Sequence, residues 1–248
     1  MFVFPMAGLS QRFIKAGYEL PKYRLKAGGQ SIFGHVLSGF SAYFKTDTFL
    51  FICRDVADTP AFVEKECKAL GIKSYEIVVL SEPTRGQAET VFLGLKQKAV
   101  SEEEPLTIFN IDTIHPDFQH PIPEDFAKMD GYLEVFQGPG DAWSFARTKS
   151  PTDNTVVETA EKRRISPYCS TGLYYFRRAA FFYDSYEKEV AKPEEEWDAK
   201  ELYIAPLYND LIASGKVVKA VEIPFSFLIP CGVPDEYEAF KKACDNRT

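Results

Sequence analysis

The sequence predicts an α/β protein built on a doubly wound, mainly parallel mixed sheet. Across residues 1–111, short apolar runs alternate with stretches whose apolar residues recur at helical spacing, which is typical of βαβ units. From about residue 129, aromatic-rich strands joined by turns rich in Gly, Pro and Asp predict a mixed or antiparallel extension of the sheet. With 248 residues, of which 45% are hydrophobic, the chain can bury a full core, and we expect a single domain.

The individual elements follow from where these patterns lie. Residues 1–6 are almost wholly apolar and predict a buried first strand. Residues 31–44 carry apolar side chains at helical spacing and predict a helix that faces the core. The other strands are expected at 48–53, 75–80, 106–111, 132–137, 143–148, 156–161, 170–176 and 217–225, and the other helices at 62–70, 86–98, 177–190, 198–214 and from Pro234 onward.

Composition narrows the class of protein. The formal net charge of −7 argues against a large nucleic-acid surface. No apolar run approaches the ~20 residues that span a bilayer, and the first strand lacks the charged flank of a signal peptide. The five cysteines are scattered and form no C-x-x-C pair, which favours reduced thiols over disulfides or a zinc site. We therefore expect a cytoplasmic enzyme without a nucleic-acid or membrane partner, and a homo-oligomer is left open.

A small-residue turn follows the first strand and precedes a cluster of basic residues. At Ala7-Gly8 side-chain bulk disappears, which leaves backbone N–H groups free, and Ser10 can cap a short helix. Such a turn beside basic side chains predicts a site for a compact polyanion, such as a triphosphate. The alternative is a tight turn followed by a solvated basic face. Between residues 12 and 26 the basic residues are Arg12, Lys15, Lys22, Arg24 and Lys26, against the single acid Glu19.

The order of these residues resembles a known signature. Ala7-Gly8-x-x-x-Arg12-Phe13, then Pro21-Lys22, then a Gly-Gly before an amphipathic helix, is similar to the nucleotidyltransferase signature of the nucleoside-diphosphate-sugar pyrophosphorylases. The family usually has Gly where this chain has Ser10, and Ser or Thr at the next position, Gln11. Neither a dinucleotide-binding G-x-G-x-x-G nor a P-loop is present. The resemblance implies a Rossmann-like, GT-A type nucleotidyltransferase fold. It also implies nucleotide binding by Ala7, Gly8, Leu9 and Ser10, and catalytic roles for Arg12 and Lys22.

Asp112 is the candidate metal ligand. It ends the apolar run 108–111, and a carboxylate there can hold Mg²⁺, although an Asx turn or a helix cap is the plain alternative. In the family, an Asp at this place binds the catalytic magnesium. A second carboxylate usually comes late in the chain, where this sequence has Pro230. Asp235, another acid or water would then replace it, or metal binding would be weaker.

Three further segments resemble substrate-binding parts of the family. Gly86-Gln87 resembles its base-recognition turn, although a helix that begins at a glycine is the plain alternative. Glu161-Lys162 matches the pair that contacts the acceptor and its phosphate, with Lys162 in a catalytic role. The segment around Gly172 and Tyr174 matches another part of the acceptor pocket. Read without the resemblance, Glu161-Lys162 is a surface charge pair and the tyrosine belongs to the core.

The resemblance implies transfer of an NMP from an NTP to a phosphorylated small metabolite such as a sugar 1-phosphate, with release of pyrophosphate. Residues 1–128 would bind the nucleotide and residues 129–248 the acceptor. The segments 16–23 and 203–209 are similar to a cytidylyltransferase subgroup from capsule polysaccharide clusters, so CTP is favoured, with UTP or another NTP left open. The alternatives are a nucleotide-sugar-dependent glycosyltransferase, for which Asn110-x-Asp112 is half of the D-x-D motif, and a non-catalytic nucleotide sensor.

Overall fold

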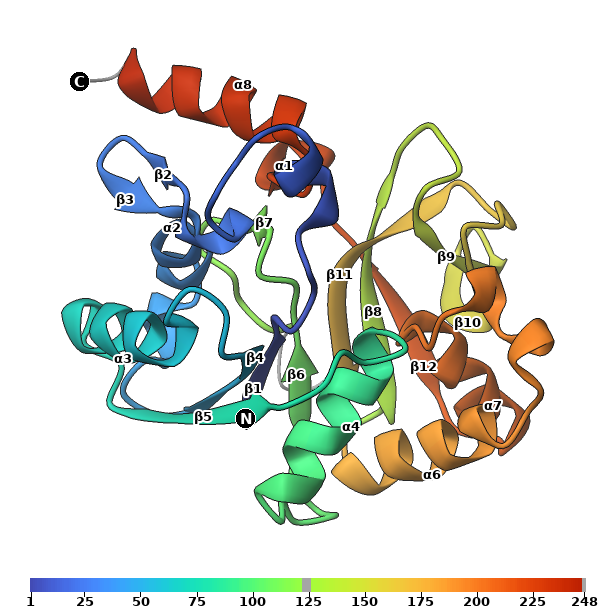
Figure 1. Cartoon of the computed structure of the whole chain (residues 1–248). Coiled ribbons are helices and arrows are strands. Elements are labelled where there is room, and N and C mark those ends of the chain that lie inside the picture. The colour runs from blue at the N-terminus through green and yellow to red at the C-terminus, as the bar shows by residue number, and fades with distance from the viewer. Residues whose placement is uncertain (122–125, 247–248) are drawn as a thin grey trace. The chain divides into compact units, whose positions relative to one another are not determined.

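The computed structural model describes residues 1–121 and 126–246, which form two compact units (Figure 1). Unit 1 contains residues 1–3, 84–109 and the described part of 120–225. Unit 2 contains residues 4–83, 110–119 and the described part of 226–248. Each unit is therefore assembled from segments that are far apart in the sequence.

Unit 2 holds one end of the main sheet, in the order β5-β4-β1. Strands β4 (Thr48–Arg54) and β5 (Ser74–Leu80) are parallel and in register from Thr48↔Ser74 to Arg54↔Leu80. Helix α3 (Thr59–Leu70) packs on both strands (Figure 1). The core of this unit is rich in aromatic side chains. In it, Phe4 stacks on Phe49 and Phe51, which are fully buried. The smaller elements are α1 (Gln11–Lys15), β2 (Lys26–Ala27), β3 (Gln30–Ser31), α2 (Ile32–Ser38), β7 (Thr113–Ile114), β13 (Ile229–Pro230) and α8 (Pro234–Asp245).

Unit 1 holds the rest of the sheet, in the order β1-β6-β11-β8-β12-β10-β9, and β1 (Phe2–Pro5) contributes residues to both units. Strand β6 is parallel to β1, β11 is antiparallel to β6 and β8, and β10 is antiparallel to β12 and β9. The strands are β6 (Leu106–Ile108), β8 (Gly131–Gln137), β9 (Ser144–Ser150), β10 (Asp153–Glu161), β11 (Tyr168–Phe176) and β12 (Val218–Glu222). The helices are α4 (Gln87–Gln97), α6 (Ala179–Val190) and α7 (Tyr208–Ala213).

The predicted fold class is confirmed. The strands β5, β4, β1 and β6 form the expected parallel part, and β11 begins the expected mixed extension. The apolar runs of β1 and β4 are buried on both faces, as parallel strands flanked by helices are, whereas β5 at the end of the strand order is only partly buried. The expected division of function between residues 1–128 and 129–248 stays a prediction.

Several element boundaries differ from the sequence-based expectation. The helix expected over 31–44 ends at Ser38 and is followed by a 3₁₀ turn over Ser41–Tyr43. Between them, Gly39 packs so closely on His115 that a Cβ at 39 would lie 2.0 Å from the His115 carbonyl oxygen. The helix expected over 198–214 is reduced to α7 preceded by short 3₁₀ turns, because Ala199 and Lys200 have positive φ and Pro206 follows. None of the described helices is long and apolar enough to cross a membrane.

Candidate active site

The turn after β1 does not have the predicted cap. Ser10 has a left-handed backbone (φ 50°), and its side chain makes no capping hydrogen bond to α1. Instead its Oγ accepts a hydrogen bond of 3.4 Å from the backbone N–H of Lys22. Helix α1 has only five residues, so its dipole adds little to anion binding. The contribution of Ser10 is therefore to hold the Pro21-Lys22 segment against the turn.

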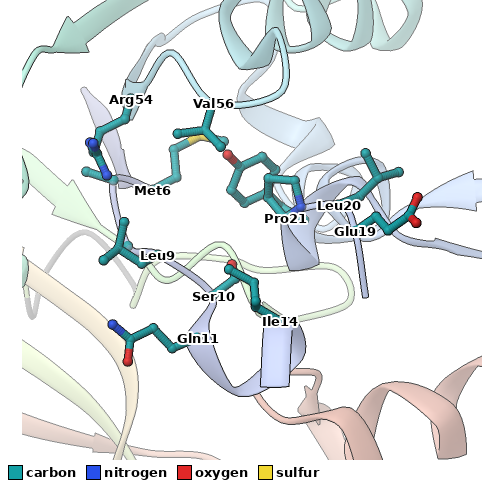
Figure 2. A pocket seen from close by; sticks show the side chains of 13 residues that line it. Met6, Leu9, Ser10, Gln11, Ile14, Glu19, Leu20, Pro21, Arg54 and Val56 are labelled. Carbon is teal, nitrogen blue, oxygen red and sulfur yellow. The ribbon is translucent and has the colours of Figure 1, made fainter. Parts of the chain in front are cut away.

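This turn separates two pockets of unit 2. One is basic, and Arg12, Lys15 and Lys22 lie in its lining together with Ser10 and Gly232. The other is largely apolar and lies between the turn and the residues that follow β4 (Figure 2). Ser10 and Gln11 line both pockets. Three of the five basic residues that the sequence singled out thus meet at one place, whereas Arg24 and Lys26 are not part of that lining and Arg24 lies over the ring of Phe62.

Lys22 and Asp112 form an ion pair, although 90 residues separate them in the sequence. Both side chains are largely shielded from solvent, with 24% and 21% of their surfaces exposed. The backbone of Asp112 is fixed by β13, since its carbonyl oxygen accepts a 2.8 Å hydrogen bond from the N–H of Cys231. Pro230 pairs with Thr113 in the same two-stranded ladder. The position where the family has its second acid is thus next to Asp112, but Pro230 offers no ligand.

Glu236 is an acid near Asp112 that the sequence analysis missed. A Cβ built on Gly232 would lie 3.2 Å from the Asp112 Oδ2 and 3.7 Å from the Glu236 Oε2, so both carboxylates border the same space. Glu236 Oε2 also accepts hydrogen bonds of 2.8 and 3.2 Å from the N–H groups of Gly232 and Val233. The neighbouring Asp235, which the sequence suggested, is exposed to solvent. The available signal was the glutamate in the first turn of a helix that begins with Pro234.

The chemistry of these ligands fits Mg²⁺ rather than a metal bound by protein alone. No group of three or more His, Cys, Asp or Glu residues that could hold a metal occurs among the described residues. Mg²⁺ is usually held by one or two carboxylates, with water and substrate phosphates completing its shell. Asp112, with Glu236 close by, offers that number of hard oxygen ligands beside a basic pocket.

In unit 1, Gly86 is required by a close backbone approach. A Cβ at this position would lie 2.4 Å from the Leu202 carbonyl oxygen. Two hydrogen bonds hold the turn against Leu202: Ala88 N–H donates to Leu202 O (2.8 Å), and Leu202 N–H donates to Arg85 O (3.0 Å). The base-binding roles of Gly86 and Gln87 stay predictions, and the structure adds a packing reason for the glycine.

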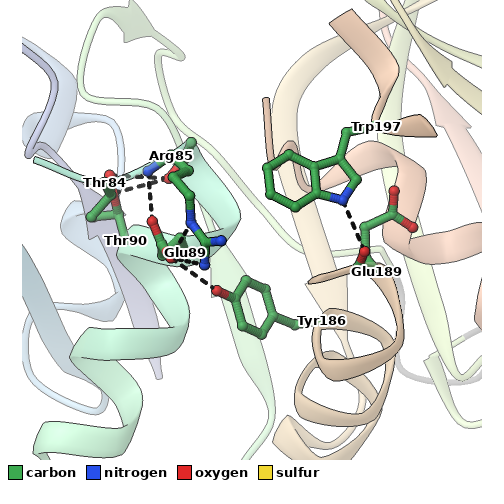
Figure 3. Close-up of polar contacts among 8 residues, drawn as sticks. Thr84, Arg85, Glu89, Thr90, Tyr186, Glu189 and Trp197 are labelled. Carbon is green, nitrogen blue, oxygen red and sulfur yellow. Dashed lines mark hydrogen bonds and ion pairs between the residues drawn. The ribbon is translucent and has the colours of Figure 1, made fainter. Parts of the chain in front are cut away.

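A polar network beside Gly86 was not foreseen (Figure 3). Arg85 donates from its backbone N–H (2.6 Å) and its Nε (2.8 Å) to the Glu89 carboxylate, which Tyr186 also approaches at 3.4 Å. Burial alone would raise the pKa of Glu89, but the hydrogen bonds from Arg85 outweigh it and the pKa is lowered. The Arg85 guanidinium also lies 5.4 Å from the ring centroid of Trp197. The network fixes the turn at 84–89, and its signal in the sequence was an Arg and a Glu four residues apart.

The predicted acceptor residues Glu161 and Tyr174 come together in unit 1. Ser144 donates a hydrogen bond to the buried Glu161 carboxylate and lies 3.2 Å from the Tyr174 hydroxyl. Burial raises the pKa of Glu161, and it raises the pKa of Tyr174 to about 12. Gly172, with φ 89°, lies in an irregular part of β11 between Ser170 and Tyr174. Such a bulge turns the side chains that follow it, so Gly172 acts on Tyr174 through the backbone.

Lys162 directly follows β10 and has a left-handed backbone (φ 51°). Its Nζ donates a hydrogen bond to the Tyr203 hydroxyl and lies 4.7 Å from the centroid of that ring. Its N–H donates to the Trp143 carbonyl at 2.9 Å. The predicted site residues thus form two groups. Ala7, Gly8, Leu9, Ser10, Arg12, Lys22 and Asp112 belong to unit 2, and Gly86, Gln87, Glu161, Lys162, Gly172 and Tyr174 belong to unit 1.

Comparison with known proteins defines the class. No protein-family model matches the chain, and no curated protein matches it. Among solved structures, the nucleoside-diphosphate-sugar pyrophosphorylase from Vibrio cholerae RC9 is 49% identical, with a TM-score of 0.93 and coverage of 98% of this chain and 100% of that one. The inositol-1-phosphate CTP transferase from T. maritima shares the fold at 14% identity, with a TM-score of 0.71 and coverage of 98% and 95%. UTP-bound UGPase from Acinetobacter baumannii does so at 14% identity, with a TM-score of 0.71 and coverage of 100% and 93%.

The fold and this close likeness define an enzyme of the nucleotidyltransferase class. Identity of 49% over nearly the whole of both chains goes further than a shared fold. The chain belongs to the family of nucleoside-diphosphate-sugar pyrophosphorylases.

Proposed function

We propose that the enzyme transfers an NMP from an NTP to a phosphorylated small metabolite, such as a sugar 1-phosphate, and releases pyrophosphate. The observation that carries this proposal is the meeting of Lys22 and Asp112 beside the basic pocket that Arg12 also lines. A cationic pocket next to a metal-binding carboxylate suits a triphosphate. The family membership supports the same reaction class.

Arg12 and Lys22 would hold the phosphates of the NTP and take up the charge that builds on the leaving pyrophosphate. Lys162 would hold the acceptor phosphate, one of whose oxygens forms the new bond to the α-phosphorus as the bond to the β-phosphate oxygen breaks. The acceptor phosphate needs no general base, because a phosphate monoester with a second pKa near 6 is mostly dianionic at pH 7. The chain therefore acts through position and charge.

Asp112 would hold Mg²⁺, with Glu236 as the second nearby carboxylate. When bound, the ion would neutralise part of the negative charge of the phosphates. The ion pair with Lys22 keeps the partly buried Asp112 carboxylate paired with an opposite charge.

For the nucleotide donor we favour CTP, with UTP as the competing donor, and for the biological setting a role in capsule polysaccharide synthesis. Support comes from the resemblance of segments 16–23 and 203–209 to capsule-cluster cytidylyltransferases. The protein would work in the cytoplasm on free nucleotide and metabolite.

The test measures pyrophosphate release with Mg²⁺, each of four NTPs, and a panel of sugar 1-phosphates, phosphocholine and phospho-amino acids. Release that needs one NTP and one acceptor together supports the transferase and identifies both substrates. Stabilisation by an NTP without any release across the panel would favour the nucleotide sensor, for which Pro230 is the supporting feature. Release of free nucleoside diphosphate from a nucleotide-sugar would favour the glycosyltransferase.

A further inference from the structure

The C-terminal helix α8 contacts the basic segment, residues 12–26, at three places along its length. The ring centroid of Tyr237 lies 6.2 Å from that of Phe13 and 5.7 Å from that of Tyr18. The Tyr237 hydroxyl donates a 2.8 Å hydrogen bond to the Lys26 carbonyl oxygen. Tyr237 itself is buried, so these contacts belong to the core of unit 2. Helix α8 thus holds both ends of the segment, and Tyr18 lies between them.

Tyr18 makes a further contact with α8 from the exposed middle of the segment. Its hydroxyl donates a hydrogen bond to the Glu238 carboxylate. Tyr18 is half-buried, whereas every other residue from 14 to 20 is exposed. The hydrogen bond to Glu238 raises the pKa of Tyr18 to about 12, so the phenol is protonated and able to donate at pH 7. The side chain that joins this exposed stretch to α8 therefore lies between Arg12 and Lys22 in the sequence.

The same helix also borders the candidate metal site. Glu236 accepts hydrogen bonds from the N–H groups of Gly232 and Val233, and its carboxylate borders the same space as that of Asp112. Gly232 in turn lines the basic pocket. Three consecutive residues of α8, from Glu236 to Glu238, thus contact either the surroundings of Asp112 or the basic segment. A helix in this place fixes the cations of the segment relative to the metal ligand.

We propose that Tyr18 and Glu238 are positioning residues for the triphosphate, because their contact holds the basic segment in the conformation that binds phosphate; the inference rests on the proposed function. Neither residue belongs to the described lining of the basic pocket, so both act through Arg12 and Lys22, which line it. A segment that is already ordered loses less conformational entropy when it binds a ligand. The contact thereby raises the affinity for a phosphate chain that it does not touch.

The alternative is that the contact only attaches α8 to the rest of unit 2. Burial argues against this alternative, since the Tyr18–Glu238 hydrogen bond is exposed whereas Tyr237 supplies the buried packing of the helix. Exposed polar contacts add little to the global free energy of unfolding. Loss of the Tyr18 hydroxyl should therefore loosen the exposed stretch and leave the helix in place.

The test measures the affinity for inorganic tripolyphosphate with Mg²⁺ by calorimetry, at a temperature where every variant is folded. Tyr18→Phe and Glu238→Ala each remove the hydrogen bond, and we expect each to weaken binding about 3- to 10-fold. The double variant should bind no more weakly than either single variant, because both substitutions break the same contact. Glu238→Gln keeps a side-chain acceptor for the Tyr18 hydroxyl and should bind at least as tightly as wild type.

The sign of these effects separates position from charge. Glu238 is an acid beside a basic segment, so removal of its charge alone would strengthen the binding of an anion. Weaker binding in Glu238→Ala with rescue in Glu238→Gln therefore requires the hydrogen bond. Glu19→Ala is the matched control, because it removes an exposed acid of the same segment and leaves the contact between Tyr18 and Glu238 in place. It should bind tripolyphosphate at least as tightly as wild type.

Equal affinity of wild type and Tyr18→Phe, or tighter binding by Glu238→Ala, would overturn the inference and leave the proposed reaction unaffected. Equal weakening in Glu238→Ala and Glu238→Gln would also overturn it. A lower melting temperature of Tyr18→Phe without a change in affinity would do the same, by making the contact an attachment of α8 alone. Binding does not depend on turnover. The expected affinities without pyrophosphate release in the acceptor panel would support the roles of Tyr18 and Glu238 and count against the transferase.

Discussion

Lys22 and Asp112 illustrate how single residues connect structure and reaction. Their ion pair is largely shielded, and Lys22 lines the basic pocket, so a ligand of that pocket can reach it. We expect Lys22→Ala and Asp112→Ala each to lower kcat by at least about 100-fold, because each removes charge stabilisation from the transition state. Each variant leaves the partner charge unpaired in a partly shielded place, which costs about 1–3 kcal/mol, so the fold should remain intact but melt at a somewhat lower temperature.

Steady-state pyrophosphate release and thermal unfolding of the same preparations test these two variants. Lys68→Ala is a suitable control, since it breaks an exposed ion pair with Glu64 on helix α3. Unchanged activity in either site variant, with a normal melting temperature, would remove that residue from the mechanism.

The acids at the start of α8 allow a matched comparison. Glu236→Gln removes a charge near Asp112 but keeps an acceptor for the N–H groups of Gly232 and Val233, so the helix start should survive. We expect it to raise the Mg²⁺ concentration needed for half-maximal activity several-fold. Asp235→Asn removes the adjacent exposed charge and should leave that concentration unchanged. A Mg²⁺ titration of activity in which both variants behave alike would exclude Glu236 as the second carboxylate.

Glu161 gives a prediction about pH. Burial raises its pKa above the ordinary 4.5, so between 4.5 and the higher folded value the folded protein binds more protons than the unfolded chain. The stability contributed by this group is therefore present below 4.5 and is lost as pH rises through the folded pKa. We expect Glu161→Gln to flatten that pH dependence and to be at least as stable as wild type at pH 7, while acceptor binding is lost.

Urea unfolding at pH 5 and pH 7 measures this effect. Glu158, on the same strand, supplies a control of opposite sign, because its hydrogen bond from Arg147 lowers its pKa. The stability from Glu158 is present above its unfolded pKa and is lost as pH falls, so Glu158→Gln should cost stability at pH 7. A Glu161→Gln protein that is less stable than wild type at pH 7 would contradict the destabilising role of the buried charge.

At the level of elements, the sequence predicts the strands better than the ends of the helices. An apolar run such as 48–53 is a local property, and β4 forms there as expected. The end of a helix depends on contacts that the sequence does not display. Helix α2 ends at Ser38, and the next residue, Gly39, packs on the backbone of His115, which lies 76 residues further along the chain. Likewise Ser10 is a residue type that often caps helices, but its Oγ accepts a hydrogen bond from the backbone N–H of Lys22 instead.

Gly8 and Gly86 are both predicted to bind the nucleotide, but they differ in how closely other parts of the chain approach them. Gly86→Ala would push a Cβ into the backbone of Leu202, and because backbone cannot move aside as a side chain can, we expect a loss of about 1–3 kcal/mol. Gly8→Ala meets nothing within 4 Å and should leave stability nearly unchanged. Chemical denaturation of both variants makes the comparison. Equal stability of the two would mean that the turn at 84–88 adjusts without cost.

At the scale of the whole molecule, the sequence supplied the residue types of the site but not all of their partners. The pairing of Lys22 with Asp112 agrees with the order of the family signature, whereas Glu236 belongs to no motif. Glu236 was missed because its nearness to Asp112 arises from the approach of segments that are far apart in the sequence. The buried contacts of Glu161 with Ser144 and Tyr174 are of the same kind.

The interleaving of segments leads to a prediction about ligand footprints. If the NTP phosphates bind the basic pocket, hydrogen exchange should slow in the unit 2 peptides around 7–24 and 110–116 when an NTP and Mg²⁺ are added. The acceptor alone should protect the unit 1 peptides around 143–146, 158–163 and 170–176, where Ser144, Glu161 and Tyr174 lie. Peptide mass spectrometry of the exchanged protein distinguishes the two sites. The Lys22→Ala variant is the control, because it should lose the protection by the NTP in unit 2 and keep the protection by the acceptor in unit 1. Protection of 158–176 by the NTP without its acceptor, and none at 7–24, would reverse the assignment of the two substrate sites.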